Sequence, residues 1–209
     1  FFHVAVMRKS SVEKVVNTDP ETERVIAEMI AWQKSGKGGV ITSAHFGNWE
    51  VALRYFIDRG IKVKALYRPL NNPYIDWLVT KARRGSNIAK GRDGNKEIIK
   101  EVKKGSFVVI LADQKVTGGV PIKFFHEEAY TTESIAKISL KYDTKLIIAK
   151  VFRLGSGFKF GFSAQEIDKS TAVEKGGGQN TELTKVITNK IEDWVRDCPG
   201  QWFWVHDRW

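Results

Sequence analysis

An uninterrupted apolar run in the middle of the chain, residues 106–112 (SFVVILA), restricts the fold more than any other feature. A strand with one face in water alternates polar and apolar residues, so a run without that alternation indicates a strand covered on both faces. A second run of this kind occupies residues 39–44. Strands covered on both faces belong mainly to parallel sheets with helices on each side. The two runs therefore indicate an α/β fold.

Helix signals alternate with strand signals along most of the chain. Asp19 and Pro20 supply an N-cap and a proline for the first turn of a helix that ends near residue 36. By the same kinds of signal we predict further helices over about 48–60, 72–85, 95–104, 132–142 and 181–197. Strands are predicted over 61–67, 121–125 and 201–209, with a hairpin formed by 145–154 and 158–165 and a loop at 176–178.

This alternation predicts one α/β domain over residues 1–209, with a mixed, mostly parallel sheet flanked by helices. A length of 209 residues fits that size, and a hydrophobic content of 42% excludes a disordered chain. The sequence starts with two phenylalanines and no methionine, so we expect a fragment. A single cysteine, Cys198, excludes an intrachain disulfide, and the four histidines are scattered, so we predict no metal site.

The formal net charge of +10 favours anionic partners. Nucleic acid, acidic lipid, a phosphorylated substrate and an acidic carrier protein all fit this charge, as does a merely soluble basic surface. Nucleic-acid binding is the rival interpretation from another class. We predict no nucleic-acid partner, because the aromatic residues are scattered and no nucleic-acid-binding motif occurs.

The stretch SAHFGNWE, residues 43–50, places His45 where a strand ends and Glu50 in the first turn of the next helix. Gly47 permits a tight turn between them, and Asn48 is a plausible N-cap. Because strand ends that face helix N-termini commonly hold the sites of open α/β sheets, we predict that Glu50 reaches back to the imidazole. A histidine with a carboxylate partner can act as a general base. The alternative is a buried structural histidine and a glutamate that complements the helix dipole.

Three more side chains follow predicted strands. Arg68 follows the strand 61–67 and could bind a phosphate or stabilise an oxyanion, or could be a surface arginine. Asp113 and Gln114 follow the strand 106–112, where they could orient an arginine or a substrate hydroxyl. Ordinary turn chemistry explains an aspartate at a strand end equally well.

The segment 81–104 holds nine basic and three acidic residues. This local excess of positive charge suits glycolipid phosphates, an anionic bilayer surface or an acidic carrier protein. Arg83 and Arg92 are the substrate-binding candidates within it. A solvated helix face is the alternative, and we prefer it for Lys100, Lys103 and Lys104.

The order of these motifs resembles one enzyme family. HFGNWE, then Tyr67-Arg68-Pro69, Asn72-Pro73 with Asp76, Asp113-Gln114 and the closing run 201–209 (QWFWVHDRW) are similar to the late acyltransferases of lipid A biosynthesis. Those are lauroyl and myristoyl transferases of the lysophospholipid acyltransferase superfamily, and the resemblance covers about residues 36–209. One departure is the stretch Phe124-Phe125-His126-Glu127-Glu128, where the family commonly has a glycine soon after the paired aromatic residues. The bulkier, charged loop leaves the acyl-chain specificity open.

The resemblance implies a glycerol-3-phosphate acyltransferase-like fold, with His45 as general base and Glu50 as its charge partner. It implies transfer of a fatty acyl group from an acyl-carrier-protein or coenzyme A thioester to a hydroxyl of a lipid A precursor, with no further cofactor. It also implies a place on the cytoplasmic face of the inner membrane, usually behind an N-terminal membrane anchor, and we expect this fragment to lack that upstream anchor. Asn48, within the same motif, joins the substrate-binding candidates.

Two related alternatives stay open. The same chemistry could act on another glycolipid, such as a phosphatidylinositol mannoside, or the chain could be an inactive relative that only binds lipid. For the closing run, including His206 and Arg208, we expect packing near the site rather than chemistry, because aromatic strands usually belong to the core.

Overall fold

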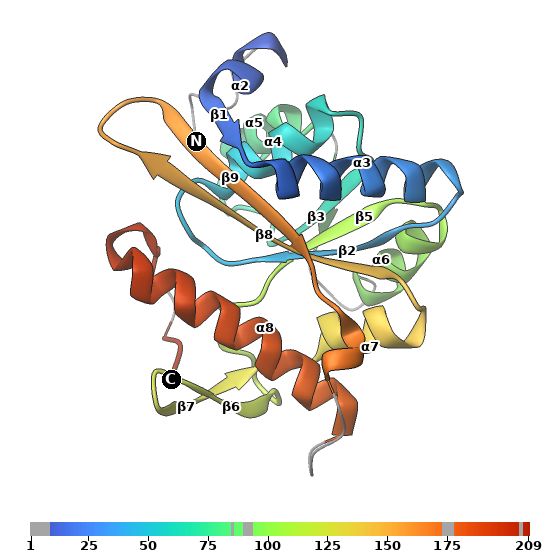
Figure 1. Cartoon of the computed structure of the whole chain (residues 1–209), viewed down its shortest axis with the longest axis vertical. Helices are drawn as coiled ribbons and strands as arrows, with labels where there is room; N and C mark the ends of the chain where they lie inside the picture. The colour runs from blue at the N-terminus through green and yellow to red at the C-terminus, as the bar shows by residue number, and fades with distance from the viewer. Residues whose placement is uncertain (1–8, 85, 90–93, 173–177, 205–206) are drawn as a thin grey trace.

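A seven-stranded sheet forms the centre of the chain in the computed structural model (Figure 1). The structure describes residues 9–84, 86–89, 94–172, 178–204 and 207–209. The strands of this sheet are β1 (Val16–Thr18), β2 (Gly39–Ser43), β3 (Val63–Tyr67), β4 (Asn87–Ala89), β5 (Phe107–Leu111), β8 (Lys145–Leu154) and β9 (Lys159–Glu166). Their order is β1-β9-β8-β2-β5-β3-β4, and only the β8–β9 pair is antiparallel. The predicted mixed, mostly parallel sheet is confirmed.

Helices cover both faces of this sheet, as Figure 1 shows. They are α2 (Lys9–Val15), α3 (Pro20–Lys34), α4 (Trp49–Asp58), α5 (Pro73–Ala82), α6 (Gly94–Lys103), α7 (Ser134–Lys141) and α8 (Gly178–Asp197). The connections β2–α4–β3 and β3–α5–β4 advance across the sheet in one direction, whereas β4–α6–β5 returns. Because parallel crossovers are right-handed, α4 and α5 lie on one face and α6 on the other.

The buried apolar residues form two clusters, one on each face of the sheet. One contains side chains of α2, α3 and α4, including Ile26 and Phe56, and the other contains side chains of α6, α7 and α8, including Ile98 and Ile187. The central strand β2 contributes Ile41 to the first cluster and Val40 to the second. This two-sided burial explains why the runs 39–44 and 106–112 contain so few polar residues.

Capping side chains fix two of the predicted helix starts. The Asp19 carboxylate accepts a hydrogen bond from the Thr22 N–H at 2.7 Å, and the Asn72 side chain accepts from the N–H groups of Tyr74 and Ile75. In both helices a proline follows the cap, where its missing N–H costs nothing. Asn48 stands at the N-cap position of α4 but makes no capping hydrogen bond through its side chain.

The structure differs from the sequence prediction in several places. The short strands β1, β4 and β7 (Glu127–Thr131) were not predicted, and β7 pairs with β6 (Val120–Phe124) in a separate hairpin. The closing run is not the predicted strand in its described part: a 3₁₀ turn at Pro199–Gln201 is followed by an isolated bridge between Trp202 and Phe46. Its aromatic rings pack on one another instead of lining a sheet.

Two further observations concern the described residues alone. None of their helices combines the length and the apolar character needed to cross a bilayer. Across the same residues, no three or more of the His, Cys, Asp and Glu side chains are grouped so as to hold a metal ion.

The core beside α4 provides a test of the packing. Phe162 of β9 is buried against Tyr55 and Phe56, with ring centroids 5.1 and 5.2 Å away. We expect Phe162→Ala to lower the free energy of unfolding by about 3–5 kcal/mol, because it leaves a cavity in a closed core. Phe158→Ala, at an exposed position four residues earlier, should change it by no more than about 0.5 kcal/mol. Urea unfolding of both variants measures the difference, and equal effects would contradict this packing.

Candidate active site

The register of β2 and β5 brings together two side chains that are distant in sequence. The two strands are parallel neighbours, and Ser43 lies opposite Leu111. His45 and Asp113 each stand two residues beyond these partners, at the carboxyl ends of their strands. Polar side chains that follow adjacent parallel strands meet at the same edge of the sheet.

The Asp113 carboxylate binds His45 through both of its oxygens. One oxygen lies 2.8 Å from the imidazole Nδ1, and the other accepts the backbone N–H of the same residue at 2.8 Å. The indole N–H of Trp202 donates to this second oxygen at 3.0 Å. Asp113 is buried, and only 11% of the His45 side chain is exposed. The carboxylate thus fixes both the position and the orientation of the ring.

These hydrogen bonds assign the imidazole tautomer. An ionised carboxylate only accepts hydrogen bonds, so Nδ1 carries a proton, and in the neutral ring the lone pair is on Nε2. The Gln114 amide nitrogen lies 3.4 Å from Nε2, at the far side of the ring. Trp49 contacts the ring edge-on, with centroids 4.9 Å apart. In the neutral ring Nε2 is therefore the nitrogen that can accept a proton, and the Gln114 amide is its hydrogen-bond partner.

The surroundings keep Asp113 ionised. Burial by itself would raise the pKa of this carboxyl. The hydrogen bonds donated by His45 and Trp202, together with the charge of the imidazole when it is protonated, outweigh that effect. The net effect is a pKa for Asp113 below its ordinary value. An ionised partner is what a histidine needs to stabilise the imidazolium that forms when Nε2 accepts a proton.

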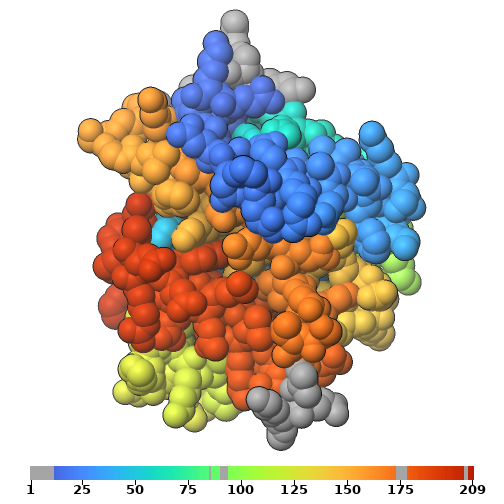
Figure 2. Space-filling view, in the orientation of Figure 1, coloured from blue at the N-terminus to red at the C-terminus, as the bar shows by residue number. Residues whose placement is uncertain are grey.

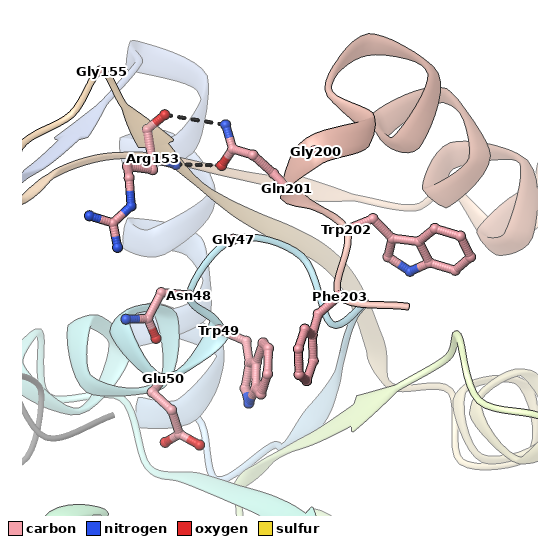
Figure 3. A pocket seen from close by; sticks show the side chains of 10 residues that line it. All are labelled: Gly47, Asn48, Trp49, Glu50, Arg153, Gly155, Gly200, Gln201, Trp202 and Phe203. Carbon is pink, nitrogen blue, oxygen red and sulfur yellow. Dashed lines mark hydrogen bonds between the residues drawn. The ribbon is translucent and has the colours of Figure 1, made fainter. Parts of the chain in front are cut away.

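The sequence predicted Glu50 as the charge partner of His45, and the structure places a different carboxylate on the imidazole Nδ1. The carboxylate on the ring belongs to Asp113, while Glu50 forms a two-pronged ion pair with the guanidinium of Arg83. Glu50 lies in the first turn of α4, and in Figure 3 its carboxylate is turned away from Trp202 and Phe203. Arg83, which the sequence predicted as a substrate-binding residue, is largely buried and makes its ion pair with this carboxylate.

The closing segment braces the turn that carries His45. The Phe203 N–H donates to the His45 carbonyl at 2.7 Å, and the Gly47 N–H donates to the Gln201 carbonyl at 2.7 Å. The Gln201 side chain also bonds both backbone groups of Arg153 on β8. The histidine turn is thus tied to the chain's end and to β8, as well as to its own strand.

A pocket opens beside this turn (Figure 3). It has a volume of about 630 Å³, within the size range of ligand sites. Its lining comes from three segments: residues 47–50, Arg153 with Gly155, and residues 200–203. In Figure 2 the light-blue, orange and red segments that correspond to them meet on the visible face. In Figure 3 the Arg153 guanidinium extends toward Asn48, so a cation stands at the pocket.

A second cavity lies under α4, between Trp49 and the sheet. Its lining is almost entirely apolar, with Leu53, Phe56 and Val109 among its residues, and Arg83 at one side. Its volume is about 50 Å³. That is far below the roughly 300 Å³ of the smallest usual ligand pockets, so the cavity does not hold an acyl chain as it stands.

The remaining predicted residues occupy different positions. Asn48 lines the pocket, and Gln114 faces His45. Arg68 is exposed directly after β3, at the sheet edge where β2 and β5 also end. Arg92 and His206 lie outside the described residues. Arg208 is fully buried and donates to the Thr131 hydroxyl and the Tyr130 carbonyl, a packing role as expected for the closing run.

Two residues of the site escaped sequence reasoning. Arg153 is the next-to-last residue of the long hairpin strand β8, where alternation predicts only a strand. Trp202 was expected to pack, yet its indole also completes the hydrogen bonding of Asp113. The only sequence signal for a role of Trp202 in the site was its position in the tryptophan-rich closing run. A run of this kind is equally typical of a buried core.

Fold and site together define an α/β protein with a buried aspartate–histidine pair at the carboxyl edge of a parallel sheet. The model of the bacterial lipid A biosynthesis acyltransferase family matches residues 1–209, and the chain belongs to that family. The family and the curated relatives that match are acyltransferases.

Two relatives come from Escherichia coli K12. A lipid A biosynthesis lauroyltransferase is 29% identical over 184 residues, and a palmitoleoyltransferase is 25% identical over 183 residues. Each alignment covers 84% of this chain and 57% of the relative, so the chain spans little more than half the length of those proteins. Among solved structures, the 1-acyl-sn-glycerophosphate acyltransferase PlsC of Thermotoga maritima aligns over 97% of this chain and 88% of its own. Its TM-score is 0.48 and its identity 12%.

The turn at Gly47 tests how tightly His45 is positioned. Gly47 has φ +56°, and a Cβ there would lie 2.1 Å from the Val151 carbonyl oxygen. Gly155 also has a positive φ, +64°, but a Cβ there meets no atom within 4 Å. Both alanine variants should lose about 1–2 kcal/mol from backbone strain. Gly47→Ala should lose about 1–3 kcal/mol more, because β8 must move. Thermal and urea unfolding measure the stability of the two variants. Equal losses would contradict the close approach of Gly47 to the Val151 carbonyl.

The lowered pKa of Asp113 predicts a pH-dependent stability. A carboxyl whose pKa is lower in the folded than in the unfolded state stabilises the fold above its unfolded pKa, about 4, and this contribution is lost as pH falls through the folded value. Asp113→Asn lacks this contribution. The difference in unfolding free energy between wild type and variant should therefore be constant near neutral pH and shrink below about pH 4. Urea unfolding of both proteins across this pH range measures the difference in unfolding free energy. A difference that grows as the pH falls would contradict a lowered pKa for Asp113.

Proposed function

We propose that the chain transfers a fatty acyl group from a thioester to a hydroxyl of a lipid A precursor. The observation that carries the proposal is the His45–Asp113 pair, with Nδ1 held by an ionised carboxylate and Nε2 left basic. Membership of the lipid A acyltransferase family supports the substrate class, as do the names of the relatives. The net charge of +10 suits a phosphorylated acceptor and an acidic carrier protein.

In the proposed reaction Nε2 of His45 accepts the proton of the acceptor hydroxyl. The hydroxyl oxygen attacks the thioester carbonyl, and a tetrahedral intermediate forms with a negative charge on the former carbonyl oxygen. The intermediate then expels the thiolate, which takes the proton back from the imidazolium. Asp113 stays ionised throughout and stabilises the imidazolium. No covalent acyl-enzyme forms.

Several side chains fit supporting roles. Arg68 or backbone N–H groups at the sheet edge would stabilise the oxyanion. The pocket of Figure 3 would take the acceptor, with the Arg153 guanidinium toward a phosphate and Asn48 within reach of polar groups. Glu50 and Arg83 would act as a fixed pair that shapes the wall beside Trp49. We propose acyl carrier protein or coenzyme A as the donor's carrier, with no cofactor beyond it.

The proposed place of action is the cytoplasmic face of the inner membrane. A lipid A precursor is an anionic glycolipid held in a bilayer, so the acceptor must be reached at a membrane surface. The partners proposed for the chain are thus acyl carrier protein, the anionic glycolipid and that surface. The basic charge supports all three, because each of them is acidic.

Three substitutions separate the roles of the two carboxylates. With an acylated carrier protein and a lipid A precursor as substrates, His45→Ala should lower kcat by about 10²–10⁴-fold. Asp113→Asn should lower kcat by a similar order, because it supports the wrong tautomer and leaves N–H groups without an acceptor. Glu50→Gln should affect kcat less, since it removes the partner of Arg83 and not that of His45.

The contrary result would be a Glu50→Gln variant that is inactive beside a fully active Asp113→Asn variant, which would restore Glu50 as the partner of His45. Full activity of His45→Ala would remove the mechanism altogether. Mass spectrometry of the product identifies the acceptor, and acylation of a different glycolipid alone would overturn the lipid A assignment.

A further inference from the structure

Helix α5 exposes an apolar face to solvent, whereas the apolar face of a helix is normally buried. Tyr74, Trp77 and Leu78 are 80%, 58% and 39% exposed, and their spacing places them in one stripe along the helix. Ile75 and Leu70 extend the apolar surface beside it. These five are among the nine exposed large hydrophobic residues of the described chain, and they fall within nine consecutive positions. We name Leu70, Tyr74, Ile75, Trp77 and Leu78 the α5 face.

Packing within the chain does not account for this arrangement. A helix of ten residues is marginal by itself, and most helices are stabilised by burying an apolar face. In α5 only Val79 is fully buried, whereas the larger side chains point to solvent. Capping by Asn72 and Pro73 holds the first turn. The apolar stripe is therefore available to a partner outside the chain.

Charge and residue type indicate which partner fits. The segment 68–84 has four basic residues and one acidic residue, Asp76, whose side chain accepts a hydrogen bond from the Leu70 N–H. Arg83 and Arg84 form ion pairs with Glu50 and Asp58. Arg68, five residues before the helix, and Lys81, in its last turn, are exposed, and the Lys81 ammonium lies 4.7 Å from the centre of the Trp77 ring. Tryptophan and tyrosine beside leucine and lysine are typical of helices that lie in the interface of a bilayer. The positive charges of Arg68 and Lys81 suit anionic headgroups.

We propose that the α5 face inserts into the interface of an anionic lipid bilayer and orients the active site toward it. α5 follows β3, on the same sheet face as α4 (Figure 1). Arg83, directly after α5, holds Glu50, which lines the pocket in Figure 3. Docking of α5 thus couples the bilayer to the wall of the pocket. The choice of a lipid partner rests on the proposed function, and the assignment of the face rests on its exposure.

Vesicle binding by the purified chain tests this proposal. The variant Tyr74→Ser, Trp77→Ser, Leu78→Ser removes the stripe, and Tyr130→Ser removes an exposed aromatic side chain of β7 as a matched control. We expect the wild type and Tyr130→Ser to sediment with phosphatidylethanolamine–phosphatidylglycerol vesicles. The triple variant should bind about tenfold or more weakly, with an unchanged circular dichroism spectrum, because three apolar side chains no longer enter the interface. Phosphatidylcholine vesicles should bind the wild type less, since they lack negative charge.

An acyl-transfer assay with a detergent-dispersed acceptor distinguishes a failure of membrane docking from a failure of the proposed reaction. The triple variant should keep its rate in detergent, whereas His45→Ala should lose the rate and still bind vesicles. The proposal is overturned if the wild type does not bind anionic vesicles. It is also overturned if the triple variant binds them as tightly as the wild type, or if Tyr130→Ser weakens binding as much as the triple variant does. It is also overturned if light scattering shows a wild-type dimer that the triple variant dissolves while vesicle binding stays unchanged, because the face would then be a contact between two copies.

Discussion

The hydrogen bonds accepted by one buried carboxylate, that of Asp113, determine the geometry of the site. They join three parts of the chain: the end of β5, the turn after β2, and the closing segment through Trp202. Burial alone would favour the protonated carboxyl, and the donors reverse that preference. Ionisation then fixes the His45 tautomer. The same interaction therefore holds the turn in place and supplies the basic nitrogen.

The Glu50–Arg83 ion pair connects this centre to the surface of the molecule. It links the first turn of α4 to the residue that ends α5. Because both side chains are largely buried, a displacement of α5 would leave a buried charge without its partner. The pair thus forms a rigid connection between the pocket and the exposed α5 face. This explains how a helix with few contacts of its own keeps a defined position.

Most of the fold could be predicted from the sequence, and only part of the site. The apolar runs of β2 and β5 have no alternation, since helices cover both of their faces. Caps at Asp19 and Asn72 mark helix starts through hydrogen bonds that are local. Glu50 looked like the partner of His45 because it is close along the chain. The first turn of α4, however, directs it to Arg83, and chain proximity carries no information about that direction.

The sequence by itself determined the parallel sheet, the helix starts and the presence of His45 at a strand end, because periodicity and capping act over a few residues. Only the tertiary structure decided which acid serves that histidine. The choice depends on β5 lying beside β2 and on the register that sets Leu111 opposite Ser43. Strand order and register come from packing between distant segments, and no local pattern encodes them. The same holds for Trp202, which reaches Asp113 only because the closing segment folds back across the turn.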